Sequence, residues 1–135
     1  MKLSNHFKLE EFIRSDTATS RSIPNEPGGK EIANLKELCV QLLQPLREHF
    51  GSPLMINSGY RCPELNRAVG GVATSQHVTG EAADVRCPDP RKLLAGLMLL
   101  GLDFDQAILY PTFLHLSYRK NGNRKQVLYA KGVLP

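Results

Sequence analysis

The chain has 135 residues and a formal net charge of +4, and 41% of its residues are hydrophobic while 7% are aromatic. These values describe one ordinary globular domain with a modest core, so residues 1–135 are expected to form a single domain. The charge suits an anionic partner such as nucleic acid or bacterial cell wall, but no basic stripe interleaved with aromatic residues is present, which argues against a nucleic-acid-binding protein.

The first part of the chain predicts helices around a polar loop. Residues 9–14 have the pattern of a short helix, and residues 15–29, SDTATSRSIPNEPGG, have the composition of a loop. Residues 30–50 carry apolar side chains at helical spacing and should form the main packing helix. Pro45 is expected to kink or divide this helix, and Gly51 supplies its end.

The middle of the chain predicts two strands and two helices. A strand running into a turn is expected over residues 53–61, PLMINSGYR, and another strand over residues 81–87, EAADVRC. PELNRAVG, residues 63–70, has the pattern of a short helix. The strongly apolar residues 90–101 predict a further helix that ends at Gly101.

Three consecutive strands are predicted next, over residues 104–110, 113–119 and 126–130. The segment KNGNRK, residues 120–125, has the composition of a charged turn and is expected to join the last two strands as a hairpin. Helices that come mostly before strands indicate an α+β fold, with the helices packed on one face of a largely antiparallel sheet.

Neither a targeting segment nor a membrane span is predicted. The N-terminal MKLSNHFKLEEF lacks the apolar core of a signal peptide, so we expect a soluble protein made in the cytoplasm. Cys39, Cys62 and Cys87 follow no CxxC spacing, which suits a reducing compartment. Cys39 lies on an apolar helix face, whereas a disulfide between Cys62 and Cys87, or a reactive thiol, stays open.

His77, Asp84 and His115 are candidate metal ligands. Asp84 lies among small apolar residues, where an ionised carboxylate needs a compensating partner. His115 alternates with Leu114 and Leu116, so its side chain is expected on the opposite face of the strand. Two imidazoles and one carboxylate form a set that catalytic zinc sites use, with a fourth position left for water. The alternative is structural: a hydrogen-bonded histidine, and an aspartate that caps a turn.

The segment SQHVTGEAADV, residues 75–85, resembles the SxHxxGxAxD signature of the zinc D-Ala-D-Ala peptidases, which include DD-carboxypeptidases, dipeptidases, murein endopeptidases and phage endolysins. The matching positions are Ser75, His77, Gly80, Ala82 and Asp84. INSGYRCPELN is similar to the family's SGYRxxxLN segment, and FDQAILY followed by FLHLS is similar to its closing strands. The resemblance implies the hedgehog/DD-peptidase fold and a zinc ion held by His77, Asp84 and His115.

The resemblance also implies roles for residues beside the zinc ion. In related dipeptidases an arginine in the segment of Arg61 faces the substrate carbonyl, where a guanidinium can stabilise developing negative charge. The alternative for Arg61 is a surface arginine in a turn. Ser75 and Gln76 would hydrogen-bond to substrate or orient a ligand, although Ser75 equally suits a turn cap before His77.

The sequence departs from the family where a general base is expected. Many members carry a glutamate three residues before the second histidine or at the end of the preceding strand, whereas this chain has Thr112 and Tyr110 there. Tyr110, Asp103 or Asp105 is a candidate replacement. A tyrosine hydroxyl suits a hydrogen-bond donor better than a base at neutral pH, and Asp105 suits pairing with a positive side chain.

Two classes of function are compatible with these residues. The resemblance implies a zinc-dependent peptidase that hydrolyses amide bonds in peptidoglycan stem peptides or cross-links, acting as a monomer without nucleic acid or membrane. The lack of a secretion signal fits a phage or prophage enzyme that reaches the cell wall by another route. The missing glutamate supports the alternative, a weakened or inactive cell-wall-binding module that retains the zinc site.

Overall fold

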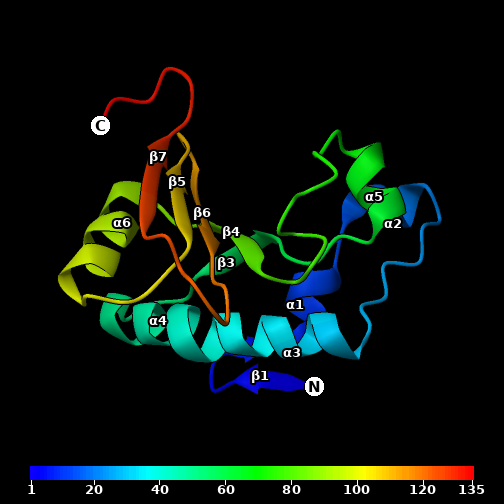
Figure 1. The fold of residues 1–135 in the computed structure, drawn as a ribbon, viewed down its shortest axis with the longest axis horizontal. Coiled ribbons are helices and arrows are strands. Elements are labelled where there is room, and N and C mark those ends of the chain that lie inside the picture. The colour runs from blue at the N-terminus through cyan, green and yellow to red at the C-terminus, as the bar shows by residue number, and fades with distance from the viewer.

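The computed structural model describes all 135 residues (Figure 1). Four short elements come first: β1 (Lys2–Ser4), β2 (Phe7–Lys8), α1 (Leu9–Ile13) and α2 (Asp16–Ser20). α1 confirms the helix predicted over residues 9–14, and β1 and β2 form a small antiparallel sheet that the sequence did not predict. The loop predicted over residues 15–29 is wrong at α2. Ser15 is the reason, because its hydroxyl accepts a hydrogen bond from the Ala18 N–H at 3.2 Å and caps that helix.

A long helical segment follows. Its parts are α3 (Gly29–Leu38), a π-helical turn (Cys39–Leu43) and α4 (Gln44–Phe50). The predicted packing helix and its division near Pro45 are confirmed, since Pro45 has no N–H to continue an α-helical ladder. The wider π-helical turn lies just ahead of it, and there the Gln44 N–H donates to the Cys39 carbonyl. Gly51 ends the segment in the left-handed conformation, as predicted.

Five strands form the main sheet, and two further helices accompany it. The elements are β3 (Met55–Ser58), α5 (Pro63–Ala68), β4 (Ala82–Arg86), α6 (Pro90–Leu99), β5 (Gln106–Leu109), β6 (Phe113–Ser117) and β7 (Gln126–Tyr129). Each lies where the sequence predicts it. Their order across the sheet is β3-β4-β6-β5-β7, and only the β5–β7 pair is parallel.

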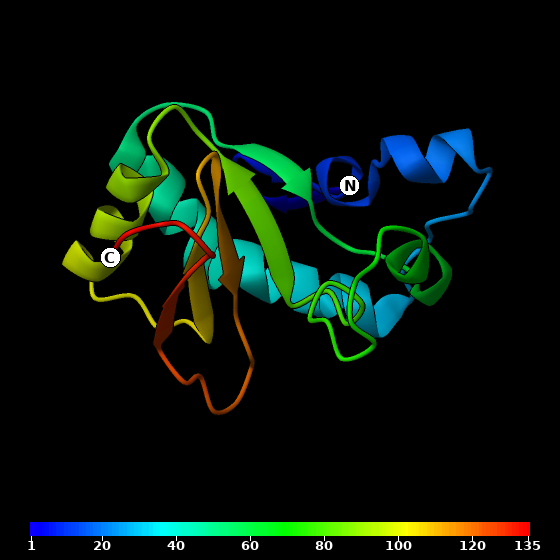
Figure 2. The same ribbon diagram turned by 90° about the horizontal axis from the view of Figure 1, so that it is seen from above.

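The connection from β6 to β7 corrects the predicted topology. Residues 120–125 do not close a hairpin, because β7 pairs in parallel with β5 at the edge of the sheet. β6 already has β4 on one side and β5 on the other, so neither of its edges is free for β7. The chain therefore loops past β5 and returns along its outer side (Figure 2).

Helices cover one face of the main sheet. Figure 2 shows α3 and α4 running behind the strands, with α6 beside α4. The side chains of β4 and β6 that enter the core are fully buried: Ala83, Val85, Leu114 and Leu116. Asp84 and His115 alternate with them and lie on the open face. The α+β class with helices on one face is confirmed. None of the helices has both the length and the apolar character needed to cross a bilayer.

The three cysteines are free thiols. The disulfide that the sequence left open between Cys62 and Cys87 is therefore not formed. Cys62 caps α5, where its sulfur accepts from the Leu65 N–H at 3.5 Å. Burial raises the thiol pKa of both Cys39 and Cys87, which disfavours a reactive thiolate at either position.

Candidate metal centre

The open face carries a carboxylate and an imidazole from adjacent strands. Asp84 of β4 and His115 of β6 are direct partners in the strand register, so the pleat of the sheet points both side chains to one side. The His115 Nδ1 atom lies 2.8 Å from the Asp84 Oδ1 atom. Only 14% and 13% of these two side chains is exposed, so bulk water competes weakly for the pair.

His77 reaches the same carboxylate from a loop. Its Nε2 atom lies 3.4 Å from the Asp84 Oδ1 atom. The Ser75 hydroxyl accepts from the His77 N–H at 3.2 Å, and the Gly80 N–H donates to the His77 carbonyl at 3.4 Å. Gly80 is required in this turn, because its φ is +78° and an added Cβ would lie 2.5 Å from the Glu31 carbonyl oxygen.

A hydrogen bond on the other side of the His77 ring determines which nitrogen is free. The Nδ1 atom lies 2.7 Å from the Gly59 carbonyl oxygen, which can only accept, so Nδ1 carries a proton. In a neutral ring Nε2 is then a bare acceptor that faces the Asp84 carboxylate, which is also an acceptor. Such a pair is repulsive unless a proton or a metal ion lies between the two atoms. The donor set therefore fits a metal ion.

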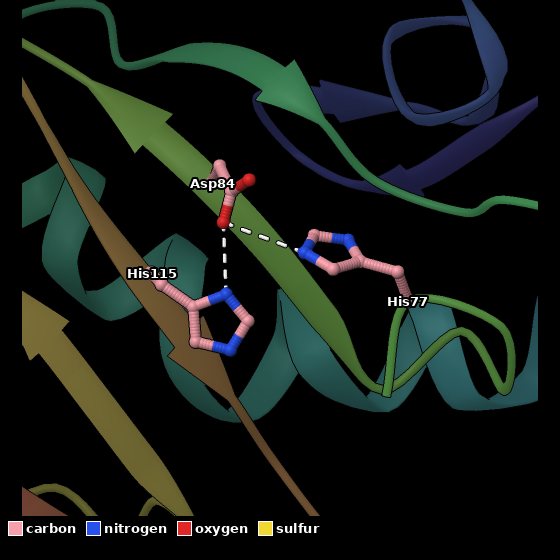
Figure 3. A group of neighbouring side chains, drawn as sticks. All are labelled: His77, Asp84 and His115. Atoms are coloured by element: carbon pink, nitrogen blue, oxygen red, sulfur yellow. Dashed lines mark hydrogen bonds and ion pairs between the residues drawn. The ribbon is translucent and has the colours of Figure 1, made fainter. Parts of the chain in front are cut away.

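Figure 3 shows the three side chains converging from the loop, β4 and β6. One ligand atom from each of His77, Asp84 and His115 lies within 4.8 Å of the other two. Imidazole nitrogens and carboxylate oxygens bind zinc at about 2.0–2.2 Å, so small side-chain movements would let all three atoms share one ion. The cluster could hold a metal ion.

Asp84 is kept ionised. Burial by itself raises the pKa of Asp84, but the hydrogen bond from His115 and the adjacent His77 ring outweigh burial and hold this pKa below its ordinary value. The Arg61 guanidinium adds positive charge on the other carboxylate oxygen, with its Nη2 atom 3.9 Å from Asp84 Oδ2. Asp84 is therefore an anion at neutral pH, which is the state in which a carboxylate binds metal.

Arg61 is fixed beside the ligands by two side chains. Its Nε donates to the Ser58 hydroxyl at 3.2 Å, and its Nη1 donates to the Asn66 Oδ1 at 3.1 Å. Asn66 is itself buried and donates to the Val72 carbonyl at 2.8 Å. Burial lowers the pKa of Arg61, and the neighbouring Asp84 opposes that shift. A guanidinium held in this way can stabilise negative charge that develops next to the cluster.

Gln76 and Asp105, two predicted site residues, contact each other. The buried Asp105 carboxylate accepts from Gln76 Nε2 at 2.9 Å, and from Arg124 Nε at 2.9 Å and Nη2 at 2.8 Å. The bond from Arg124 is the main reason that the pKa of Asp105 falls to about 2. Asp105 therefore has the pairing with a positive side chain that the sequence left open, and it makes no hydrogen bond to the three ligands.

Tyr110 and Asp103 make no hydrogen bond to the ligands either. Tyr110 stacks on Phe113, with ring centroids 4.4 Å apart and planes at 10°. Asp103 accepts from the Asn123 amide at 3.0 Å. A role as general base stays a prediction for both residues.

Two clefts flank the cluster. The larger, of about 530 Å³, reaches His115 and has an almost wholly polar lining that includes Ser75, Gln76, Glu81, Gln106, Arg119 and Arg124. Glu81 is its only acidic residue. The smaller, of about 260 Å³, is lined by Arg61 together with Ser58 and Tyr60. The larger cleft meets the cluster at His115, and the smaller one meets it at Arg61.

Three groups that hold the site were missed by sequence reasoning: the Gly59 carbonyl, Asn66 and Arg124. Gly59 and Asn66 belong to the INSGYRCPELN segment, whose similarity to the family pointed to these positions. That similarity did not indicate which side chains they contact. Arg124 had no signal, because an arginine in a charged turn is indistinguishable from a solvated one until the fold brings it to Asp105.

A His-Asp-His cluster on the open face of an α+β sheet, with a guanidinium beside it and clefts on two sides, is a centre of the metallopeptidase type. The family model described as Peptidase M15 matches residues 5–108. The chain belongs to this family of zinc-dependent, D-Ala-D-Ala carboxypeptidase-like peptidases, which confirms the resemblance. The match contains Arg61, His77 and Asp84 and ends before His115. Comparison with curated proteins yields no match.

Proposed function

We propose that the protein is a zinc-dependent peptidase that hydrolyses amide bonds in peptidoglycan stem peptides or cross-links. The observation that carries this proposal is the convergence of His77, Asp84 and His115, with the His77 Nε2 atom left free to bind metal. Family membership supports the reaction class. The net charge of +4 suits an anionic cell-wall polymer.

Zinc would supply Lewis acidity, which polarises a carbonyl and acidifies water. Its proposed ligands are His77, Asp84 and His115. Arg61 would bind the scissile carbonyl oxygen and stabilise the negative charge that develops there. The two clefts would hold the peptide on either side of the scissile bond, with Ser75 and Gln76 in the wall of the larger one.

Three side chains are candidates for the general base that accepts the proton of the attacking water, and substitution of each one can identify it. Glu81 is the acid of the larger cleft, where its Oε1 accepts from the Thr79 hydroxyl at 2.6 Å, whereas Tyr110 and Asp105 are two of the three candidates from the sequence. The pH profile of kcat/KM should be recorded for Glu81→Gln, Tyr110→Phe and Asp105→Asn. Loss of the general base should lower kcat by about 10²–10⁴-fold and remove the acidic limb of the profile.

Digestion of purified peptidoglycan tests the function. Zinc-loaded protein is incubated with the polymer, and the released fragments are identified by mass spectrometry beside His77→Ala and the surface control His49→Ala. We expect the wild type and His49→Ala to release the same fragments. Chelation should abolish these fragments, and His77→Ala should not produce them. Equal fragments from His77→Ala, or a wild-type protein that takes up no zinc on titration, would contradict it.

The alternative function is a cell-wall-binding module that retains the zinc site without cleaving peptide. The observation in its favour is that no acidic residue lies at positions 110–112, while Asp105 is engaged by Arg124 and Gln76. Zinc-bound protein that sediments with peptidoglycan and releases no fragment would establish this alternative.

Partner, compartment and oligomeric state are further proposals. We expect the protein to bind a peptidoglycan peptide and to bind neither nucleic acid nor membrane. We also expect it to act at the cell wall, which it would reach by the kind of release that phage lysis enzymes use. We also expect a monomer, which sedimentation equilibrium at micromolar concentration can test; a dimer mass at that concentration would contradict it.

A further inference from the structure

Asp105 is a buried anion with a complete set of donors. Its Oδ1 accepts from the Arg124 backbone N–H at 3.0 Å and from Arg124 Nε at 2.9 Å, while its Oδ2 accepts from Arg124 Nη2 at 2.8 Å and from Gln76 Nε2 at 2.9 Å. A carboxylate offers about four acceptor sites, so all of them are used. The side chain of Asp105 has no exposed surface. A carboxylate in this state acts through the groups it holds.

Gln76 connects this anion to the metal ligand next to it in the chain. While its side chain donates to Asp105, its carbonyl accepts from the Glu81 N–H at 2.9 Å and from the Thr79 hydroxyl at 3.1 Å. The segment from Ser75 to Gly80 contains no helix or strand, so no regular hydrogen-bond ladder positions His77. The contact between Gln76 and Asp105 anchors this segment to the start of β5.

Arg124 lies on the connection between β6 and β7, outside the residues that the family model matches. Its neighbours are tied to the same place, since the Lys125 N–H donates to the Phe104 carbonyl at 2.9 Å and the Gln126 N–H donates to the Asp105 carbonyl at 3.0 Å. The unusual return of the chain alongside β5 is what brings this arginine to Asp105. The result is a continuous bridge from the β6–β7 connection to the loop of His77.

We propose that Arg124, Asp105 and Gln76 form a bridge that preorganises the His77 loop for metal, so that Gln76 and Arg124 are positioning residues of the centre. The inference rests on the proposed zinc site. Contacts that orient a metal ligand without touching the metal typically contribute about 10–100-fold to metal affinity. The bridge therefore makes zinc affinity depend on residues that do not contact the zinc ion.

The test compares zinc affinity with stability of the metal-free protein. The variants are Gln76→Leu, which leaves the Asp105–Arg124 pair whole, and Arg124→Met. The exposed Gln41→Leu and Lys120→Met serve as controls, the second replacing another basic side chain by methionine. Zinc dissociation constants are measured by competition with a chromophoric chelator, and urea titration of the metal-free proteins verifies folding. Gln76→Leu and Arg124→Met should each weaken zinc binding about 10-fold or more, and the controls should match the wild type.

The double variant provides a sharper outcome. If both residues act through Asp105, Gln76→Leu combined with Arg124→Met should bind zinc no more weakly than the worse single variant, whereas independent effects would multiply. Multiplied effects, or wild-type affinity in Gln76→Leu, would overturn the proposal. If the wild type binds no zinc, the proposed function is wrong. Hydrogen exchange in the metal-free protein then tests whether the bridge orders the His77 loop. Amides of residues 76–81 should then exchange faster in Gln76→Leu than in Gln41→Leu, and equal rates would refute it.

Discussion

Gly59 occupies a tightly packed backbone position beside the metal centre. A Cβ there would lie 2.7 Å from the Phe12 carbonyl oxygen and Cβ atom, so Gly59→Ala must push α1 away from the end of β3. The same residue supplies the carbonyl that accepts the His77 Nδ1 hydrogen bond. We expect Gly59→Ala to lower the free energy of unfolding by about 1–3 kcal/mol and to weaken zinc binding.

Urea titration and chelator competition measure the two effects of Gly59→Ala. Gly29→Ala is the matched control, because an added Cβ meets no heavy atom within 4 Å there. A Gly59→Ala protein as stable as this control would show that the close approach to Phe12 is not a constraint.

Asp105 makes part of the stability dependent on pH. Its pKa in the folded state is about 2, below the ordinary 3.8, so its contribution is present above about pH 4 and is lost as the pH falls towards 2. The shift corresponds to roughly 2 kcal/mol. The difference in unfolding free energy between wild type and Asp105→Asn should therefore shrink by about this amount between pH 5 and pH 2. Urea titrations across this range measure it, and a pH-independent difference would contradict the assignment.

At the scale of the elements, the π-helical turn delivers a polar side chain to the N-terminal hairpin. Gln44 follows the turn, and its Oε1 accepts from the Ser4 hydroxyl at 2.8 Å and the His6 N–H at 2.9 Å. Gln44→Ala removes these bonds and should cost about 1–2 kcal/mol. It should also speed hydrogen exchange in β1 and β2, whereas the exposed Gln41→Ala should not. Unchanged exchange in Gln44→Ala would mean that other contacts hold the hairpin.

Local patterns predicted most elements, while pairing between distant segments escaped them. The helices near Pro45 and after Pro90 were predictable because apolar spacing and a proline act within a few residues. The pairing of β7 was not, since residues 120–125 suit a hairpin turn equally well and only the occupied edges of β6 exclude one. α2 was not predicted because the polar composition of its segment indicated a loop, whereas the hydrogen bond that caps the helix at Ser15 stabilises a helix there.

At the scale of the whole molecule, the three candidate ligands could be named from the sequence, but their support could not. The signature places His77 and Asp84 seven residues apart, whereas His115 comes from a strand whose register with β4 is a property of the fold. The bridge through Asp105 needs the return of the chain along β5, which no short motif encodes. A sequence signature can therefore identify the candidate metal ligands, whereas the residues that position these ligands can be identified only once the topology of the fold is known.

The proposed zinc site joins segments that are distant in the chain, so zinc should stabilise the whole fold. Its ligands come from the loop, β4 and β6, and the unfolded chain does not hold them together. At a free zinc concentration 100 times the dissociation constant, binding adds about 2.7 kcal/mol, which corresponds to a rise in Tm on the order of 10 °C for a domain of this size. Calorimetry should show this rise with zinc and its reversal by chelation. Magnesium should have no effect, because it prefers oxygen ligands. Asp84→Asn should lose the zinc-dependent rise while the exposed control Glu48→Gln keeps it; a rise that persists in Asp84→Asn would place the ion elsewhere.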